Sequence, residues 1–394
     1  MWAFGREGEV VQELMPEFER RHPGVRVRAQ MVPWTAAHEK LLTAFVGEST
    51  PDLAQIGNSW IPELVAVGAL ERLDPWIAAS PTVDPEGYFP GIWDTNVIDG
   101  GVYGIPWYVD TRVLFYRTDL LAAAGVTVMP TTWAGWRQAM EKVAARQGAK
   151  RYAILLPTDE WAQPIALGLQ TGSAMLRDGG GRGAFSAPEF RRAFDFYLGI
   201  FRDGLAPVSN NTQIANIFQQ FAGGDFAMYI TGPWNVSEFR KRLPPEMRDR
   251  WMTAPLPGPD GPGVSLAGGS SLSVFSRSEH PKEAWALIEY LSEPAQQVRF
   301  YELSSDLPAR REAWDDPVLA NDLHVRAFWE QLQRVRATPK VPEWEQIVTK
   351  VYEHADAAIR GRVTGDEALA DLDREVDRIL EKRRFLLARQ KEES

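Results

Sequence analysis

The chain has 394 residues, of which 44% are hydrophobic and 24% are charged, a balance typical of a globular protein with a sizeable core. Its 43 Lys and Arg against 53 Asp and Glu give a net charge of −10, which argues against binding of nucleic acid or anionic lipid through an overall basic field. The lack of cysteine excludes disulfides, thiolate zinc sites, cysteine nucleophiles and iron–sulfur clusters. The length predicts one large two-lobed protein or two ordinary domains.

Helical and extended segments alternate along the first part of the chain. Apolar residues recur at helical spacing over residues 10–18, and an alternating strand is expected over 25–29. A second helix over 37–45 precedes a buried strand over 51–56, which ends at Gly57. This order of elements is typical of an α/β fold.

The alternation continues through the middle of the chain. A strand is expected over 113–116, a short helix then ends at Gly125, and Thr131–Thr132 cap the next helix before a strand over 152–156.

Two further helices carry the signature of a capping box. In the first, Ser186 stands three residues before Glu189, and in the second Thr364 stands before Glu367. Between these helices, the Pro- and Gly-rich run over 255–269 has no hydrophobic period, which suits a crossover or hinge between domains.

The usual enzyme and metal motifs are not found. The five histidines form no His-Glu-x-x-His motif, and Gly268–Leu272 lacks the final glycine of a nucleophile elbow. The acid pairs Asp159/Glu160 and Glu343/Glu345 lie near tryptophans, and such pairs serve glycosidases as well as plain sugar binding. The sequence therefore predicts no metal, no cofactor and no catalytic residue.

Four segments resemble, in order and spacing, the family 1 extracellular solute-binding proteins of ABC sugar importers, most closely the maltose/trehalose-type branch. These segments are Gln55–Glu63, Gly104–Arg112, Gly232–Val236 and Gly268–Leu272. The resemblance implies a type II periplasmic-binding fold, in which two α/β lobes close over a sugar and present it to the permease subunits in the inner membrane. It also implies a monomer in the periplasm, although no signal peptide or lipid-acceptor cysteine stands in the given chain.

The resemblance divides the chain into lobes that exchange segments. The N-terminal lobe is expected to hold residues 1–109 and 266–309, and the C-terminal lobe residues 113–262 and 313–394. The hinge crossings are expected near 109–113, 257–265 and 308–314.

The resemblance also implies a set of ligand-binding residues. Carboxylates accept hydrogen bonds from sugar hydroxyls, tryptophans stack on the apolar sugar face, and the glycine–serine pair offers backbone groups at close approach. The residues are Arg6, Glu7, Asn58, Trp60, Tyr108, Asp110, Arg112, Asp159, Glu160, Trp234, Gly269, Ser270, Glu343 and Trp344.

The residues alone leave other roles open for several members of this set. Arg6 and Glu7 are equally compatible with a solvated turn after the first strand, and Trp344 with core packing at a helix start. Asn58 follows a strand at the carboxyl edge where open α/β sheets bind ligands. Tyr108 and Asp110 alternate on one face of an extended segment together with Arg112.

The predicted function is non-catalytic binding of an α-linked disaccharide such as trehalose, maltose or sucrose. One alternative is a carboxylate-dependent glycoside hydrolase or transferase that uses Asp110 or the pair Asp159/Glu160. Another is a binding protein for a different solute such as glycerol 3-phosphate.

Overall fold

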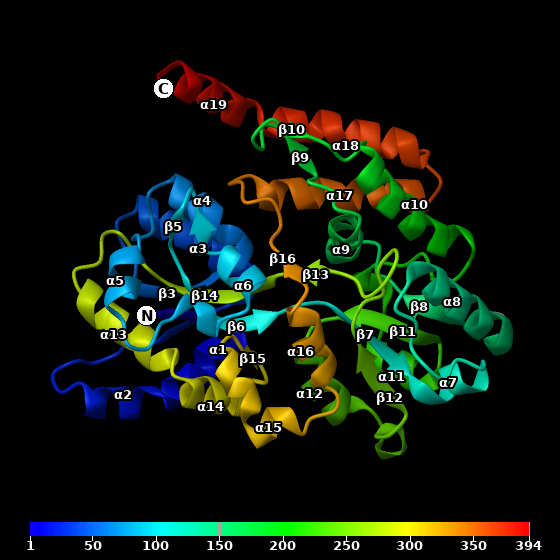
Figure 1. The fold of residues 1–394 in the computed structure, drawn as a ribbon, viewed down its shortest axis with the longest axis horizontal. Coiled ribbons are helices and arrows are strands. Elements are labelled where there is room, and N and C mark those ends of the chain that lie inside the picture. Colours follow the sequence, from blue (N-terminus) through cyan, green and yellow to red (C-terminus); the bar gives the residue numbers. More distant parts are fainter. Residues whose placement is uncertain (149–150, 394) are drawn as a thin grey trace. The chain divides into compact units, whose positions relative to one another are not determined.

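The computed structural model describes residues 1–148 and 151–393, which form two compact α/β units. Unit 1 consists of residues 1–110, 267–322 and 340–342, and unit 2 of residues 111–266, 323–339 and 343–394. The chain thus passes between the units several times, and the expectation of two α/β lobes is confirmed (Figure 1).

One crossing lies elsewhere than the sequence suggested. The chain leaves unit 1 after Asp322 and, following a short return at Lys340–Pro342, again before Glu343, whereas residues 308–314 lie inside unit 1. The reason is a short edge strand, β15 (Leu307–Pro308), that pairs with β6 (Ile105–Asp110) and holds this segment on the sheet.

The core of unit 1 is a six-stranded mixed sheet in the order β15-β6-β14-β3-β1-β2. The remaining strands are β1 (Trp2–Phe4), β2 (Gln30–Val32), β3 (Leu53–Gly57) and β14 (Gly268–Val274). β1 is parallel to β2 and β3, while β14 is antiparallel to both β3 and β6. The carboxyl ends of β1, β3 and β6 therefore lie at the same edge as the amino ends of β14 and β15.

Helices cover this sheet because their apolar faces pack on buried strand residues such as Phe4 and Ile56. The helices of unit 1 are α1 (Gly5–Val10), α2 (Met15–Arg21), α3 (Trp34–Val46), α4 (Ile61–Ala66), α5 (Asp74–Ala79), α6 (Pro90–Asp94), α13 (Pro281–Leu291), α14 (Pro294–Ser304) and α15 (Pro317–Ala320). The small strands β4 (Val97–Ile98) and β5 (Gly101–Val102) form a hairpin.

The core of unit 2 is a four-stranded sheet in the order β12-β7-β11-β8. Its strands are β7 (Val113–Arg117), β8 (Tyr152–Leu155), β11 (Phe226–Thr231) and β12 (Trp251–Ala254). β8 is parallel to β11, and β7 is antiparallel to β11 and β12. The carboxyl ends of β8, β11 and β12 thus share an edge with the start of β7.

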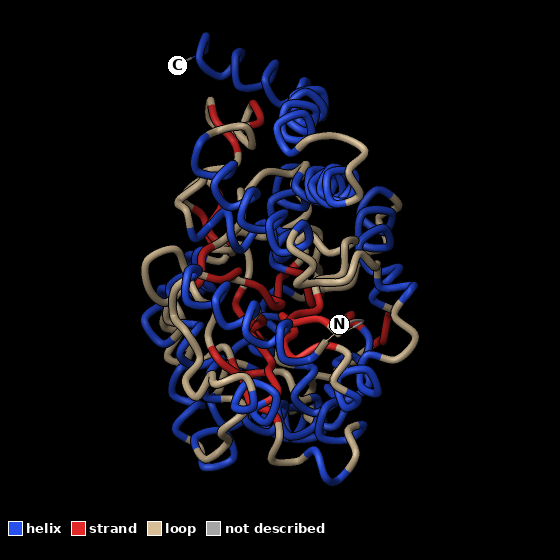
Figure 2. The backbone as a smooth tube through the Cα atoms, turned by 90° about the vertical axis from the view of Figure 1, so that its right-hand side faces the viewer, coloured by secondary structure: helices blue, strands red, loops and turns tan. Residues whose placement is uncertain are grey.

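The helices of unit 2 are more numerous and longer, and Figure 2 distinguishes all helices from the strands. They are α7 (Thr118–Ala123), α8 (Trp133–Gln147), α9 (Ala162–Gln170), α10 (Pro188–Arg202), α11 (Ile217–Gly223), α12 (Trp234–Arg242), α16 (Arg326–Leu332), α17 (Trp344–Ile359), α18 (Gly365–Ile379) and α19 (Glu381–Glu393). Two short ladders complete the unit, β9 (Leu176–Arg177) with β10 (Arg182–Gly183), and β13 (Ser265–Leu266) with β16 (Val335–Arg336).

Of the local elements predicted from the sequence, one capping box is present in the structure and two other predictions are wrong. Thr364 caps α18 in a complete capping box with Glu367, as predicted. The box predicted at Ser186 is wrong, because α10 begins at Pro188 and its N-cap Ala187 offers no side-chain bond. The strand expected over 25–29 is also wrong, since the paired strand β2 lies directly after it.

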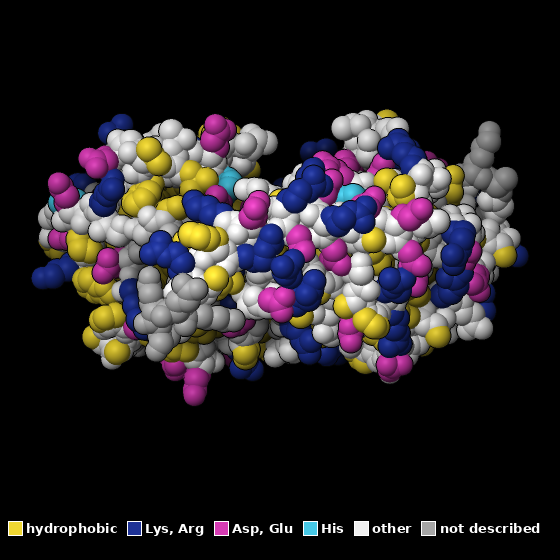
Figure 3. All heavy atoms as spheres, turned by 90° about the horizontal axis from the view of Figure 1, so that it is seen from above, with side chains coloured by type: hydrophobic (Ala, Val, Ile, Leu, Met, Phe, Trp, Pro, Cys, Tyr) yellow, Lys and Arg dark blue, Asp and Glu magenta, His cyan; other side chains and the backbone are white. Residues whose placement is uncertain are grey.

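Charged side chains of both signs are interspersed on the face drawn in Figure 3. None of the helices in residues 1–148 and 151–393 combines the length and the apolar character that a bilayer crossing needs.

Candidate functional site

Polar and aromatic side chains gather at the edge of the unit 1 sheet where β1, β3 and β6 end. Arg6 and Glu7 follow β1, and they lie in the first turn of α1 rather than in the loop expected from the sequence. Asn58 and Trp60 follow β3, while Tyr108 and Asp110 end β6. Gly269 and Ser270 start β14 at the same edge. The topology thus brings together all eight candidates that belong to this unit.

Glu7 is the centre of a buried hydrogen-bond network at this edge. It is only 7% exposed, and its Oε1 accepts a hydrogen bond of 2.8 Å from the Tyr108 hydroxyl. Its Oε2 accepts one of 3.3 Å from Trp34 Nε1. Burial, and after it the charge of Glu7, raises the pKa of Tyr108 well above its ordinary value. The phenol therefore remains a hydrogen-bond donor at all physiological pH values.

Gln55 on β3, which sequence reasoning missed, joins this network to the backbone. Its Oε1 accepts a 2.7 Å hydrogen bond from the Phe4 backbone N–H, and its Nε2 donates to the Tyr108 hydroxyl at 3.1 Å and to Ser270 Oγ at 3.2 Å. Ser270 Oγ also donates to the Tyr108 hydroxyl at 3.0 Å. One fully buried amide therefore ties four strands together and holds the Tyr108 ring in place.

Gly269 provides a close approach of two strands next to these groups. Its φ is +118°, and a Cβ at this position would overlap the Tyr108 carbonyl oxygen. Only glycine fits this combination of backbone angle and contact. Ser270 is fully buried with its hydroxyl turned into the network, so its side chain supports Tyr108 from within the sheet.

An aromatic cluster lies beside the carboxylate of Glu7. The Trp60 ring packs against Phe4 at 5.9 Å, against Trp34 at 5.7 Å and against His38 at 5.0 Å between centroids. Trp34 is 37% exposed, so part of its indole is open to solvent. Sequence reasoning missed Trp34, although its position directly after Pro33 at the start of α3 is visible in the sequence.

Asn58 lies at the same edge with an unused donor. Its side chain is 6% exposed, and its Oδ1 accepts a 3.3 Å hydrogen bond from Ser271 Oγ. Within the described part of the chain, Asn58 Nδ2 has no hydrogen-bond partner. A buried donor without a partner is costly, so an incoming acceptor would be stabilised there.

The edge of the unit 2 sheet holds a second group of candidates. Arg112 directly precedes β7, Asp159 and Glu160 follow β8, and Trp234 follows β11. The strand directions bring these ends to one edge. Four of the six candidates in unit 2 therefore share an edge by topology alone.

Trp234 and Arg112 form a cation–π pair at this edge. The Arg112 guanidinium carbon lies 4.7 Å from the centroid of the Trp234 ring, and the indole is 42% exposed. The ring folds back over Gly232, where a Cβ would overlap it. The backbone of Arg112 is fixed by Ser265, whose Oγ donates to the Arg112 carbonyl at 2.9 Å. The pair thus presents a partly exposed aromatic surface on a fixed backbone.

The acid pair Asp159/Glu160 is held by one asparagine. Asn211 donates from its backbone N–H to Asp159 Oδ1 at 2.9 Å and from Nδ2 to Glu160 Oε1 at 3.1 Å. The pair also acts on the fully buried Tyr197 hydroxyl, whose pKa is raised mainly by burial and secondly by the charge of Glu160. A carboxylate offers about four lone-pair sites, so each of these acids can accept hydrogen bonds beyond those from Asn211.

Glu343 and Trp344 open α17 and do not follow a strand of the sheet. Trp344 is 1% exposed. Neither Trp344 Nε1 nor Glu343 Oε2 has a hydrogen-bond partner among the residues that the structure describes. The packing role left open for Trp344 fits this burial, whereas its unused N–H leaves a donor for a ligand.

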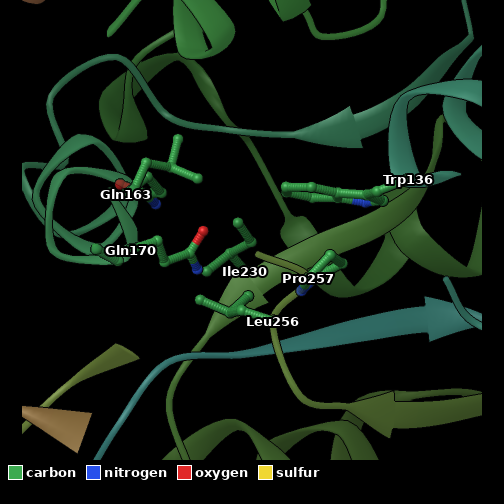
Figure 4. A pocket seen from close by; sticks show the side chains of 8 residues that line it. Trp136, Gln163, Gln170, Ile230, Leu256 and Pro257 are labelled. Atoms are coloured by element: carbon green, nitrogen blue, oxygen red, sulfur yellow. The ribbon is translucent and has the colours of Figure 1, made fainter. Parts of the chain in front are cut away.

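A small cavity lies inside unit 2, lined by residues of α8, α9, β11 and the segment after β12 (Figure 4). Its lining includes Trp136, Gln163, Ile230 and Leu256, and it holds about one water molecule at most. It is therefore too small for a sugar ring and separate from the candidate residues.

The donor set of the described residues does not fit a metal centre. No group of three or more His, Asp or Glu side chains in residues 1–148 and 151–393 is placed to hold a metal ion. What the two edges offer instead is carboxylate and amide acceptors beside aromatic rings, which is the chemistry of neutral polar ligands.

Comparison with known proteins identifies similar chains. The sugar-binding protein MalE of Xanthomonas citri is 49% identical, with 98% of each chain covered and a TM-score of 0.96. A putative binding protein of Brucella abortus (strain 2308) is 25% identical over 96% of this chain and 91% of the relative. The galactooligosaccharide-binding protein of Bacillus subtilis (strain 168) is 25% identical over 93% of this chain and 84% of the relative.

A profile of bacterial extracellular solute-binding proteins matches residues 5–298. This match confirms the resemblance stated from the sequence motifs. The family consists of binding proteins and not enzymes, which confirms the expectation of a non-catalytic protein. Because the match spans more than half of the chain, the protein belongs to the bacterial extracellular solute-binding protein family.

Proposed function

We propose that this protein is the sugar-binding component of an ABC importer and that its ligand is an α-linked disaccharide such as maltose, trehalose or sucrose. The observation that carries the proposal is the network at the unit 1 edge, where Glu7, Tyr108 and Gln55 form a buried, oriented set of groups. Support comes also from the 49% identical protein of Xanthomonas citri, which is described as sugar-binding.

The chemistry of the unit 1 edge suits a sugar hydroxyl. A carboxylate that is held by two donors accepts further hydrogen bonds in a fixed direction, and fixed direction is what discriminates one hydroxyl from its epimer. Glu7 has this property, and Asp110 adds a second carboxylate at the end of the neighbouring strand. Trp60 and Trp34 supply aromatic surface for the apolar face of the same ring.

The chemistry of the unit 2 edge suits the remainder of the ligand. Trp234 offers a partly exposed indole, and Asp159 with Glu160 offers acceptors. A ligand that contacts both units binds their closed arrangement better than the open one, so it shifts the population toward closure. In this proposal the hinge lies at the chain crossings, the closed form is recognised by permease subunits, and the protein acts as a monomer in the periplasm.

Isothermal titration calorimetry tests the ligand class directly. The panel is maltose, trehalose, sucrose, glucose and glycerol 3-phosphate, and the expected result is one-to-one binding of a disaccharide at micromolar or lower dissociation constant, about −8 kcal/mol. The measurement is repeated on Asp110→Ala and Trp234→Ala. Both variants are expected to weaken binding by at least about tenfold, since each removes a contact with the ligand.

Two matched controls separate ligand contact from general damage. Glu302→Gln changes an exposed acid of unit 1, and Phe385→Ala an exposed aromatic residue on α19 of unit 2. Both should bind like the wild type. Tight binding of glycerol 3-phosphate alone would replace the disaccharide by an anionic solute, and silence across the panel would contradict the proposed ligand class.

A further inference from the structure

One carboxyl at the unit 1 edge was not among the candidates. Asp306 directly precedes β15, and the ladder pairs Leu307 with Val109, so the next position of the register sets Asp306 opposite Asp110. Directly opposite residues of antiparallel strands lie about 5 Å apart between Cα atoms. Gly268 is the partner of Asp110 on its other side. Asp306 therefore stands at the same edge as Asp110 and the network of Glu7.

A tight turn between α14 and β15 directs the chain into the strand that follows Asp306. Helix α14 ends at Ser304, and Ser305 takes a left-handed conformation with φ of +72°. Its N–H donates to the Tyr301 carbonyl at 2.7 Å, and the N–H of Asp306 donates to Ser304 Oγ at 3.0 Å. A non-glycine residue in this region costs of order 1 kcal/mol and persists only where its surroundings fix it. The turn therefore fixes the direction in which β15 and Asp306 begin.

The surroundings of Asp306 favour the neutral acid. Burial and the charge of Glu7 raise the pKa of Asp306 well above its ordinary value, and Asp110 acts in the same direction, while the Ser304 hydroxyl opposes the shift. The charged and titratable side chains on the elements packed against it are Arg6, Glu7 and Glu9 on α1, Tyr108 and Asp110 on β6, Arg299 and Glu302 on α14, and Arg311, Glu312 and Asp315 in the turn after β15.

The cation on α1 is engaged with other groups. Arg6 donates to Glu9 Oε2 at 3.1 Å and to the Leu303 carbonyl at 3.4 Å, and its side chain is largely exposed. The Tyr108 hydroxyl donates its hydrogen bond to Glu7 and not to Asp306. Close carboxyl groups disfavour one another's ionisation, so their proximity favours the protonated form of one of them.

We propose that Asp306 is a further ligand-binding residue, which in its protonated form donates a hydrogen bond to a sugar oxygen, while Glu7 and Asp110 accept hydrogen bonds from sugar hydroxyls. This inference rests on the proposed function for its ligand. A protonated carboxyl adds a donor to an edge that is otherwise rich in acceptors, and it thereby selects ligands with an acceptor, such as a ring or glycosidic oxygen, at that point.

The sign of the pH dependence follows from the raised pKa. Between the pKa of Asp306 in the unfolded chain and its higher pKa in the folded protein, the folded state holds more protons, so the contribution of this group to stability falls as pH rises. Asparagine cannot ionise. Asp306→Asn should therefore raise the melting temperature of the ligand-free protein at about pH 8 and change it little at about pH 4.

The first measurement is thermal unfolding of the ligand-free wild type, Asp306→Asn and the control Glu302→Gln between about pH 4 and pH 8. Glu302 is an exposed acid in the last turn of α14, four residues before Asp306. A gain in melting temperature that grows with pH in Asp306→Asn, and not in Glu302→Gln, is the expected result. An equal response of the two variants would contradict the raised pKa of Asp306, whatever the ligand is.

The second measurement is calorimetric titration with the sugar of the panel that the wild type binds, at about pH 6 and about pH 8. Wild-type affinity should fall as Asp306 ionises, by up to about tenfold per pH unit above its pKa. Asp306→Asn, which keeps a donor, should remain pH-independent, whereas Asp306→Ala should bind at least about tenfold more weakly at both values. Wild-type affinity in Asp306→Ala would overturn this inference and leave the proposed function intact. Absence of binding by the wild type would overturn both.

Discussion

The candidate edges of the two units are built differently. In unit 1, Glu7, Tyr108 and Gln55 are buried and bonded to one another, so each side chain is fixed before a ligand arrives. In unit 2, the corresponding edge carries a partly exposed indole under a guanidinium and acids that are bonded to one asparagine. Fixed polar groups favour selectivity, whereas an exposed ring adapts to different ligand shapes. We therefore expect substitutions in unit 1 to affect folding and binding together, and those in unit 2 to affect binding alone.

The largest expected effect is on stability, from Gln55→Leu in unit 1. This change removes the acceptor of the Phe4 N–H and the donor to the Tyr108 hydroxyl, leaving buried polar groups without partners. Such losses cost about 3 kcal/mol together, which chemical denaturation followed by circular dichroism will measure. Gln30→Leu, on the exposed surface of β2, is the control and should change stability by less than about 0.5 kcal/mol. Equal effects of the two variants would contradict the central role of Gln55.

Gly269→Ala should have the second largest effect on stability, a destabilisation of about 2 kcal/mol. The residue has a positive φ, and the added Cβ would meet the Tyr108 carbonyl. Gly68→Ala in the same unit is a matched control, because its φ is +73° but its surroundings are open. The control isolates the backbone strain, about 1 kcal/mol. The same denaturation measurement then gives the cost of the contact as the difference, and a difference of zero would refute the close approach.

Trp234→Ala in unit 2 should leave stability within about 0.5 kcal/mol of the wild type, because the ring is 42% exposed. Binding of the disaccharide should weaken by about tenfold, or about 1.4 kcal/mol, through loss of aromatic stacking. Calorimetry and denaturation on the same sample separate the two quantities. A large loss of stability would contradict the expectation that substitutions at the unit 2 edge affect binding alone.

Asp159→Asn should have the smallest effect on folding. The carboxylate accepts its hydrogen bonds from Asn211 in an exposed setting, so the change in unfolding free energy should stay below about 0.5 kcal/mol. Glu7→Gln is the like-for-like comparison in unit 1, and it should cost more, at about 1–2 kcal/mol, because its partners are buried. Denaturation curves of the two variants measure the contrast directly.

Local patterns in the sequence predicted elements well where the pattern was self-contained. Thr364 and Glu367 form their predicted box within one turn of helix. Ser186 and Glu189 have the same spacing, but the N–H of Ser186 donates to Asp373 Oδ2, 187 residues later in the chain. A tertiary contact of that kind overrides a local preference, and no local pattern reports it.

The candidate site shows the same limit. The carboxyl end of a predicted strand led to Asn58, because the edge of an α/β sheet is where ligands bind, and the family resemblance led to Asp110. Asp306 was missed because its position depends on β15, whose pairing with β6 joins segments far apart in the sequence. Pro308 was placed at the start of an expected hinge for the same reason. Gln55 was missed because an amide inside an apolar strand carries no signal of what it bonds.

The place of β14 in the sheet has a consequence for the order in which the protein is made. This strand lies between β3 and β6 in unit 1, yet its residues follow the whole of the first long segment of unit 2 in the chain. During synthesis, a nascent chain that has reached only residue 267 therefore holds the unit 1 sheet as two separated pieces. The N-terminal segment must wait, with apolar strand edges exposed, until the later strand emerges. Completion of the first unit is thus timed by the synthesis of the second.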